Sequence, residues 1–338
     1  MKILVTGSTS GLGRNATEWL LAAGHQAVAA GRDLVVGKML TDAGADFRFV
    51  DLDSATPAQL TSLVQGCDAV WHCAAKSSPW GKASDFMRTN VDLTDRLALA
   101  AGQAGVPRFV HISTPAVYFD FRHHADIDES YRAKRFANHY ARSKFLAEGC
   151  ITQRQQQFPA TRFTVLRPRG LFGAHDRVIV PRILEQIRLN KGVLRLPRGG
   201  ETLLDLTFSL NVVEAMWQAT AQPHLPPAAI YNITNQQPER LGDMLHQLLN
   251  EQLGIRFTLR PVPYRLLYGV ASGMELLAQA RGREPLLTRY SVGAVNFDMT
   301  LSQARAISEL HYRPVYSMQQ AIGLTAQAMR ENKGVHRG

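Results

Sequence analysis

Residues 2–23 constrain the fold of this chain more than any other stretch of the sequence. An apolar run comes first, the glycine-rich turn Thr-Gly-Ser-Thr-Ser-Gly-Leu-Gly-Arg occupies residues 6–14, and a helical pattern follows it. A strand, a glycine-rich turn and a helix in this order are the context that a dinucleotide-binding fingerprint requires. The sequence therefore predicts a nucleotide site at the carboxyl end of the first strand.

The three glycines of this turn have separate expected roles. Gly7 allows the tight turn, Gly11 lets the backbone approach a pyrophosphate, and Gly13 lets the helix pack close to the strand. We expect the pyrophosphate at the helix N-terminus, where free N–H groups and the helix dipole favour an anion. The predicted cofactor contacts in this turn are Gly7, Thr9, Ser10, Gly11, Leu12, Gly13 and Arg14.

Strands and helices alternate through the first half of the chain. Strands are predicted at 2–6, 26–30, 46–50, 68–73 and 108–113, with helices near 12–23, 33–43, 57–65 and 85–104. This alternation predicts an α/β fold of the Rossmann type, with a doubly wound parallel sheet covered on both faces.

The second half predicts a smaller, mostly C-terminal lobe for substrate. We expect residues 203–210 and 211–217 to return to the sheet as a strand and a helix, and residues 229–234 to form a late strand. The dinucleotide-binding domain is therefore predicted to comprise 1–172 with 203–235, and the substrate-binding lobe 173–202 with 236–338.

The end of the second predicted strand bears on cofactor choice. Folds that prefer NAD place an acidic residue here for the ribose 2′-hydroxyl, but this position holds Gly31, and Arg32 follows it. Because a guanidinium suits a 2′-phosphate, we predict NADP(H) over NAD(H). The alternative is that Asp33 takes the acidic role and serves NAD. Asp51 and Leu52, after the third strand, are predicted to hold the adenine edge.

Tyr140 and Lys144 provide the predicted acid–base chemistry. Four residues apart on a helix, they lie on one face, and a nearby ammonium favours the phenolate and lowers the pKa of the tyrosine. Such a tyrosine can exchange the proton of a carbinol while a hydride moves elsewhere. From the spacing alone, a solvated helix face is the alternative.

Composition limits the function classes. The formal net charge of +10 suits anionic ligands but is spread along the chain, so nucleic-acid binding is disfavoured. Only three cysteines occur, at 67, 73 and 150, too few and too scattered for a disulfide framework or a zinc site, and no metal is expected. The N-terminus does not read as a signal peptide, so we expect a cytoplasmic protein.

Several motifs together resemble the extended short-chain dehydrogenase/reductases. They are the glycine-rich turn, the run His-Cys-Ala-Ala at 72–75, and Tyr-x-x-x-Lys at 140–144, in that order. Trp80-Gly81 after the Ala-Ala pair is similar to the 3β-hydroxysteroid dehydrogenase group, which includes sterol and β-keto-acid reductases. The resemblance implies hydride transfer between nicotinamide and a carbonyl or secondary alcohol, with Tyr140 as general acid/base and Lys144 binding the ribose.

The same resemblance implies further site residues. Thr114, with Ser113 as the second choice, is expected to hydrogen-bond the substrate oxygen, and Asn90 is placed in a proton relay or, equally, is a structural amide. The remaining implied cofactor contacts are Ala74, Ala75, Lys76, Pro168, Arg169 and Leu171. Family members commonly dimerise through the helices that hold Asn90 and Tyr140, so a homodimer is expected.

Three alternatives remain open from the sequence. A sugar-nucleotide epimerase or dehydratase uses the same residues with tightly held NAD. A non-catalytic NADP-sensing regulator is a second known outcome for this fold, and a basic nucleic-acid-binding protein is the third alternative.

Residues 264–280 form an apolar stretch shorter than the about 20 residues that span a membrane. We predict a buried or pocket-lining helix there, in keeping with a hydrophobic substrate, with peripheral membrane contact as the less favoured alternative.

Overall fold

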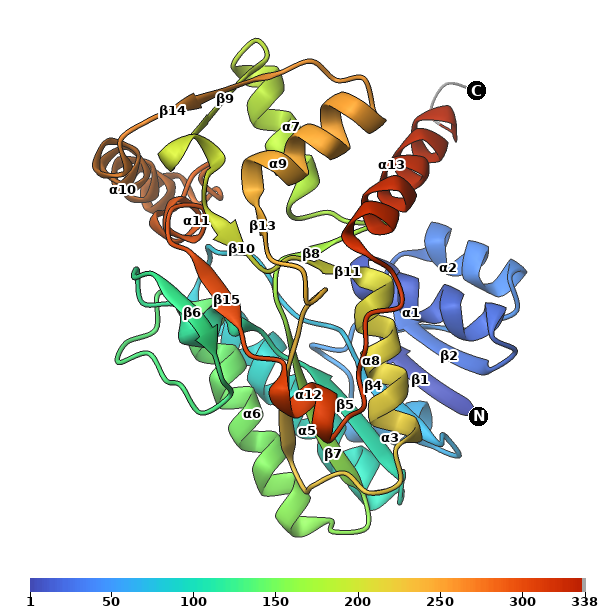
Figure 1. Cartoon of the computed structure of the whole chain (residues 1–338). Helices are drawn as coiled ribbons and strands as arrows, with labels where there is room; N and C mark the ends of the chain where they lie inside the picture. Colours follow the sequence, from blue (N-terminus) through green and yellow to red (C-terminus); the bar gives the residue numbers. More distant parts are fainter. Residues whose placement is uncertain (336–338) are drawn as a thin grey trace.

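A seven-stranded parallel sheet forms the centre of the computed structural model, which describes residues 1–335 (Figure 1). The strands lie in the order β12 (Ala229–Ile233), β7 (Arg162–Pro168), β5 (Arg108–Ile112), β4 (Ala69–His72), β1 (Lys2–Thr6), β2 (Gln26–Gly31) and β3 (Asp46–Phe49). Each neighbouring pair is parallel. The strand order reverses at β1, which lies between β2 and β4, and ligands of such sheets bind outside the carboxyl ends at that point. The predicted Rossmann sheet is confirmed.

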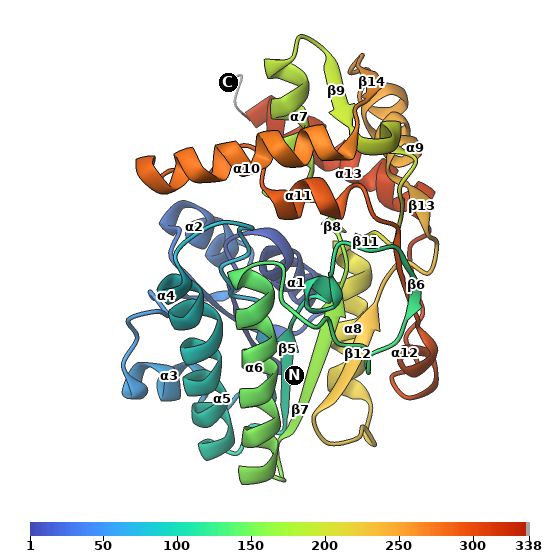
Figure 2. The same ribbon diagram turned by 90° about the vertical axis from the view of Figure 1, so that its left-hand side faces the viewer.

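Helices cover both faces of this sheet (Figure 2). Side chains of α1 (Gly11–Ala22), α2 (Leu34–Asp42) and α8 (Ser209–Ala221) pack on one face, and those of α3 (Pro57–Val64), α5 (Leu93–Gln103) and α6 (His139–Gln157) on the other. Within β1, Ile3 and Val5 belong to the first core and Leu4 to the second, because successive strand residues face opposite sides.

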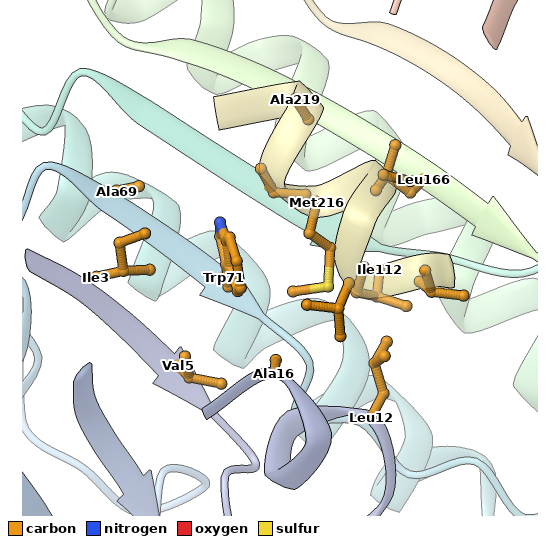
Figure 3. Close-up of a cluster of buried hydrophobic side chains, with 14 of the residues drawn as sticks. Ile3, Val5, Leu12, Ala16, Ala69, Trp71, Ile112, Leu166, Met216 and Ala219 are labelled. Carbon is orange, nitrogen blue, oxygen red and sulfur yellow. The ribbon is translucent and has the colours of Figure 1, made fainter. Parts of the chain in front are cut away.

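The core between α1, α8 and the sheet shows how the layers are joined (Figure 3). Ile3 and Trp71 extend from the strands toward Met216 on α8, and all three side chains are fully buried. The Trp71 indole N–H donates to Thr220 Oγ1 at 2.8 Å, so the buried ring leaves no unpaired donor. This packing fixes α1, and with it the glycine-rich turn, against the sheet.

Most of the remaining elements form a separate apolar core or connect to it, whereas residues 83–92 lead directly into α5. α7 (Val180–Leu189), α9 (Leu241–Leu245) and α13 (Met318–Val335) share a separate apolar core. The other elements are α4 (Ala83–Phe86), β6 (His124–Ile127), β8 (Leu171–Phe172), β9 (Val193–Leu196), β10 (Leu203–Leu204), β11 (Thr207–Phe208), β13 (Glu239–Arg240), β14 (Thr258–Pro261), α10 (Tyr264–Arg281), α11 (Arg289–Ala294), β15 (Met299–Leu301) and α12 (Ala304–Ser308), with π-helical turns at Met87–Asp92 and His246–Gln252 and 3-10 turns at Pro115–Tyr118 and Pro197–Gly200.

The prediction that residues 203–210 form one strand of the central sheet is wrong. β10 pairs with β13 and β15, β11 pairs with β8, and neither belongs to the seven-stranded sheet. Asp205 lies between the two short strands, is buried, and accepts a hydrogen bond from Leu301 N at 2.7 Å. A buried carboxylate needs such donors, so it directs the chain toward β15. The boundaries of the two lobes stay a prediction.

α10 does not form the buried or pocket-lining helix predicted for 264–280. Its buried side chains include Ala271 and Glu275, whereas Leu266, Leu276 and Leu277 are exposed. The cleft described below is lined by residues that follow α10, not by α10 itself. In the part of the chain that the structure describes, no helix combines the length and the apolar character needed to cross a membrane.

Candidate cofactor and catalytic site

A cleft of about 710 Å³ lies along the carboxyl ends of the central strands. One wall is built from the ends of β1, β2, β4, β5 and β7 together with the start of α6, and the opposite wall from α7, α11 and the segments near them. It therefore runs from the glycine-rich turn to Tyr140, over the part of the sheet where the strand order reverses.

The glycine-rich turn has the geometry expected for a phosphate cradle. Gly7 has φ +68°, and a Cβ there would lie 3.0 Å from Ala74 Cα. A Cβ on Gly13 would lie 2.3 Å from Gly7 O, so α1 packs directly on the turn. Gly11, at φ +50°, faces open space with nothing within 4 Å. Ser10 is the N-cap of α1 but makes no side-chain cap hydrogen bond, which leaves its hydroxyl free for a ligand.

The end of β2 presents a cation rather than an acid to the cleft. Arg32 is 69% exposed, and its guanidinium lies 3.4 Å from the Asp51 carboxylate. Gly31, Arg32, Asp51 and Leu52 all line the cleft. Asp33 instead caps α2, because its Oδ1 accepts from Val35 N at 3.0 Å and from Val36 N at 3.1 Å. Asp33 is not among the residues that line the cleft.

Thr9 fills the space beside Gly31. A Cβ on Gly31 would lie 2.6 Å from Thr9 Cγ2 and 2.9 Å from its Oγ1. Thr9 is nearly buried, so it has little room to move aside. An acidic side chain at position 31 would therefore collide with the wall of the cleft.

Tyr140 and Thr114 meet at the other end of the cleft. α6 begins just before Tyr140, where the Asn138 side chain accepts from Ala141 N at 2.8 Å as its N-cap. Thr114 is held by its own turn, since its Oγ1 accepts from Ala116 N at 3.2 Å. Burial raises the pKa of Tyr140 to about 12, while hydrogen bonding with the Thr114 hydroxyl acts in the opposite direction. Both residues line this end of the cleft.

Lys144 does not act on Tyr140 as the sequence predicted. Its ammonium donates to Ile112 O and lies 3.3 Å from His111 Nε2, and burial lowers the pKa of Lys144 to about 8. The expected fall in the pKa of Tyr140 is wrong for the protein alone, because the phenol is desolvated and the ammonium is directed at the main chain of β5. Lys144 still lines the cleft, one helical turn from Tyr140.

Asn90 is a structural amide. Its Oδ1 accepts from Lys76 N at 2.8 Å, and its Nδ2 donates to Lys76 O at 3.1 Å and to Ser143 Oγ at 2.9 Å. Asn90 is buried and is not among the residues that line the cleft. Its side chain therefore holds the loop after β4 against α6 and is fully occupied in doing so.

Two predicted cofactor side chains point elsewhere. Lys76 Nζ lies 3.7 Å from the Asp85 carboxylate, and Arg14 Nε lies 2.8 Å from Glu18 Oε1. Neither residue is in the wall of the cleft, although Ala74 and Ala75 are. Each long side chain is drawn to a nearby carboxylate, a pairing that depends on the fold and that the motif does not encode.

Ser113 and Thr114 both line the cleft but have different hydrogen-bond partners. The Ser113 hydroxyl donates to Glu148 Oε1 at 2.5 Å, and Glu148 in turn forms a buried ion pair with Arg167. Although burial works against its charge, hydrogen bonding to Glu148 raises the pKa of Arg167. The Ser113 hydroxyl is thereby committed to a structural network, so Thr114 is the better candidate to hold a substrate oxygen.

Sequence reasoning missed the far wall of the cleft. Tyr290 of α11 and the arginines Arg177 and Arg182 line it. Its apolar residues include Ile179, Ile183, Leu204, Leu206, Leu241 and Leu286. These residues come from separate elements that meet only through tertiary packing, and no spacing in the sequence links them. Pro168, Arg169 and Leu171 also line the cleft, as the resemblance implied.

Comparisons with known proteins agree with this geometry. A family model described as the NAD dependent epimerase/dehydratase family matches residues 3–234. The chain is 43% identical over 334 residues to the uncharacterized protein YbjS of Escherichia coli, covering 98% of each. It is 30% identical over 338 residues to a Stigmatella aurantiaca protein named 4-hydroxy-2-methyl-3-oxo-4-farnesyl-3,4-dihydroquinoline-1-oxide ketoreductase, covering 99% of this chain and 98% of that protein.

Other similarities are more distant. A Shewanella oneidensis protein named 2-alkyl-3-oxoalkanoate reductase is 29% identical, and the alignment covers 95% of this chain and 81% of that protein. A Mycobacterium tuberculosis protein named 3 beta-hydroxysteroid dehydrogenase/Delta 5-->4-isomerase is 27% identical, and the alignment covers 95% of this chain and 88% of that protein. Among solved structures, UDP-glucuronic acid 4-epimerase from Bacillus cereus with NAD aligns with a TM-score of 0.76 at 18% identity, over 98% of this chain and 99% of that one. At that identity the structural likeness shows the fold alone.

Proposed function

The chain belongs to the NAD dependent epimerase/dehydratase family, and on this basis we propose that it reduces a carbonyl group of a hydrophobic substrate with NADP(H). The observation that carries the proposal is the presence of Tyr140 and Thr114 in the wall of a cleft that begins at the glycine-rich turn. The open space at Gly11 and the close approaches at Gly7 and Gly13 fit a bound dinucleotide.

The protein's own residues would supply position and a proton, while a bound nicotinamide supplies the hydride. Because burial raises the pKa of Tyr140 to about 12, its phenol is protonated at neutral pH and suited to donate a proton to the substrate oxygen. The Thr114 hydroxyl can donate to the same oxygen as it gains negative charge. The Lys144 amine, one turn along α6 in the cleft wall, would exchange its contact with Ile112 O for a hydrogen bond to a cofactor ribose.

NADP(H) is the proposed cofactor. Arg32 is exposed at the end of β2, where it can pair with a 2′-phosphate by exchanging its contact with Asp51. Asp33 is committed to capping α2, and Thr9 leaves no room for an acid at position 31. These contacts favour a 2′-phosphate over a 2′-hydroxyl.

The proposed substrate is largely apolar. Leucine and isoleucine side chains from α7, from the segment containing β10, and from the loop before α11 line the wall that faces Thr114. A sugar nucleotide would leave many of its hydroxyls unpaired against such a wall. The two named reductase relatives act on a farnesylated quinoline oxide and on 2-alkyl-3-oxoalkanoates, in keeping with an apolar ketone here.

Replacing Tyr140 with Phe tests the proposal. NADPH oxidation with 3-oxooctanoate and its methyl ester as probes should fall by about 100-fold or more, because the proton donor is lost. NADPH affinity, followed by nicotinamide fluorescence, should stay close to that of the unchanged protein. Tyr316→Phe is the matched control, since Tyr316 is outside the cleft wall. Unchanged turnover in Tyr140→Phe would refute the assignment.

A further inference from the structure

We infer that Arg169 forms an anion-binding subsite beside the reacting carbonyl, so that the substrate is a keto acid held by its carboxylate. This inference rests on the proposed function for the reaction, but the subsite itself is argued from the contacts of Arg169. The resemblance places only the backbone near Arg169 against the nicotinamide, and no role follows from it for the guanidinium.

The Arg169 guanidinium is a cation in the cleft wall without an ion-pair partner. Its Nε donates to Met299 O at 3.2 Å, and within the described residues no carboxylate oxygen lies within 4.0 Å of it. Burial lowers the pKa of Arg169, as expected where a charge has lost water without gaining a counter-ion. A partly buried guanidinium with free donors favours an anion.

Nearby arginines differ from Arg169 in pairing or in exposure: Arg177 also lines the cleft without an ion pair among the described residues, but it is exposed, whereas Arg169 is partly buried. Arg167, two residues earlier, is fully buried and paired with Glu148, and Arg182 at the cleft is paired with Glu284 at 2.5 Å. The buried acid that influences Arg169 is Asp205, but its Oδ2 is engaged by Leu301 N at 2.7 Å. Asp205 therefore moderates the charge of Arg169 without occupying its donors.

The position of Arg169 points to the substrate rather than to the cofactor phosphates. Arg169 lies just after β7 and Thr114 lies just after β5, and these two strands are neighbours in the sheet. Tyr140 and Tyr290 line the same cleft. The phosphate cradle at Gly11 and the cation at Arg32 belong to the glycine-rich turn and to β2. An anion on Arg169 would thus lie near the oxygen that Tyr140 protonates.

The chemistry of this pairing defines the substrate class. A planar guanidinium binds a carboxylate through two parallel hydrogen bonds, and here the Nη groups are available for them. A carboxylate a few bonds from a ketone, with an alkyl chain beyond, places its charge on Arg169, its carbonyl at Tyr140 and its chain against the apolar wall. A neutral ketone or an ester would leave the cation unpaired.

A binding experiment tests the subsite without any turnover. The protein saturated with NADP⁺ is titrated with decanoate and with 1-decanol, two probes of equal chain length that differ in charge, and thermal shift and calorimetry report binding. We expect decanoate to bind more tightly than decanol, and Arg169→Gln to lower decanoate affinity by about 10- to 100-fold. Arg169→Lys, which keeps the charge but loses the fork, should retain part of that affinity.

Arg177→Gln distinguishes a specific subsite from a general positive field. Arg177 also lines the cleft and is exposed, so its removal changes the net charge by the same amount. Equal losses of decanoate affinity in Arg177→Gln and Arg169→Gln would overturn the inference. Equal affinity of the unchanged protein for decanoate and decanol would also overturn it.

Kinetics separate this inference from the proposed function. With 3-oxooctanoate and its methyl ester, Arg169→Gln should lower kcat/KM for the acid by about 100-fold and for the ester far less. If the unchanged protein and Arg169→Gln both reduce the acid and the ester with equal kcat/KM, the subsite is refuted and the proposed reductase activity stands. Arg169-dependent decanoate binding with no reduction of either probe would support the subsite and count against the reductase. A folded Arg169→Gln, verified by its melting temperature, is required because Arg169 also contacts Met299 O.

Discussion

Residues close together in the sequence have opposite tasks in this site. The Ser113 hydroxyl donates to the buried Glu148, whereas the Thr114 hydroxyl accepts from Ala116 N in the cleft wall. Arg167 completes the same buried network, whereas Arg169 lies in the cleft wall. The chemistry of the cleft therefore depends on which of two similar side chains the backbone turns toward it.

Cofactor choice can be tested at single residues. Arg32→Ala should weaken NADPH binding by about 10-fold or more, since one charge-assisted contact to the 2′-phosphate is lost, with little effect on NADH. Gly31→Asp should weaken both cofactors, because its Cβ would lie 2.6 Å from Thr9 Cγ2. Adding Thr9→Ala to Gly31→Asp removes that collision and should restore NADH binding preferentially. Fluorescence titration measures each case, and NADH binding gained by Gly31→Asp alone would contradict the steric account.

The sequence predicted the residues whose roles are local. The glycine-rich turn and the Tyr140–Lys144 spacing depend on neighbours within a few positions, and the structure brings them to one cleft. Arg14 and Lys76 were misplaced because Glu18 and Asp85 capture their side chains. Tyr290 could not be predicted, since only the packing of the second lobe places α11 opposite α6.

At the scale of elements, a buried polar network ties the catalytic helix to the sheet. Arg167 on β7 forms an ion pair with Glu148 on α6, Ser113 after β5 donates to the same carboxylate, and the Tyr118 hydroxyl accepts from Arg167. The Asn232 side chain on β12 extends the network by accepting from Tyr118 at 2.8 Å. These segments are thereby held to α6, the helix that carries Tyr140.

Breaking this network should destabilise the protein. Arg167→Met leaves Glu148 buried without its cation and should lower the free energy of unfolding by about 3–5 kcal/mol. Adding Glu148→Gln removes the orphaned charge, so the double variant should be more stable than Arg167→Met alone. Urea denaturation measures both, and a loss below about 1 kcal/mol for Arg167→Met would show that the pair is not a significant constraint.

The sequence predicted helices and strands correctly where the apolar pattern is regular. It predicted them incorrectly where tertiary contacts decide the structure. The strands of the central sheet have continuous apolar runs because both faces are buried, which makes them recognisable. Residues 203–210 show the same apolar character but are divided by Asp205, whose partner Leu301 is distant in the chain. In α10 the apolar content is real, yet Leu276 and Leu277 face solvent, and composition alone could not reveal that.

At the scale of the whole molecule, two helical surfaces could accept a second copy of the chain. α5 and α6 pack side by side along one face of the sheet (Figure 2), and their outward positions include the half-buried Leu99 and Leu146 and the exposed Gly149. The other surface is α10, where Leu277 is 56% exposed. A homodimer through α5 and α6 follows the family expectation, and the small Gly149 would let two helices approach closely.

Charge substitutions distinguish the two surfaces. Leu146→Glu places a carboxylate inside the expected dimer interface, where burying the charge without a partner costs several kcal/mol. The variant should therefore sediment as a monomer of 37.4 kDa, and the unchanged protein should sediment at twice that mass. NADPH binding should persist in Leu146→Glu, because its side chain is not part of the cleft wall. Leu277→Glu on α10 is the matched control and should remain dimeric. Dissociation by Leu277→Glu and not by Leu146→Glu would move the interface to α10. A monomer in the unchanged protein at micromolar concentration would refute the dimer, and the complete cleft within one chain would then be the functional unit.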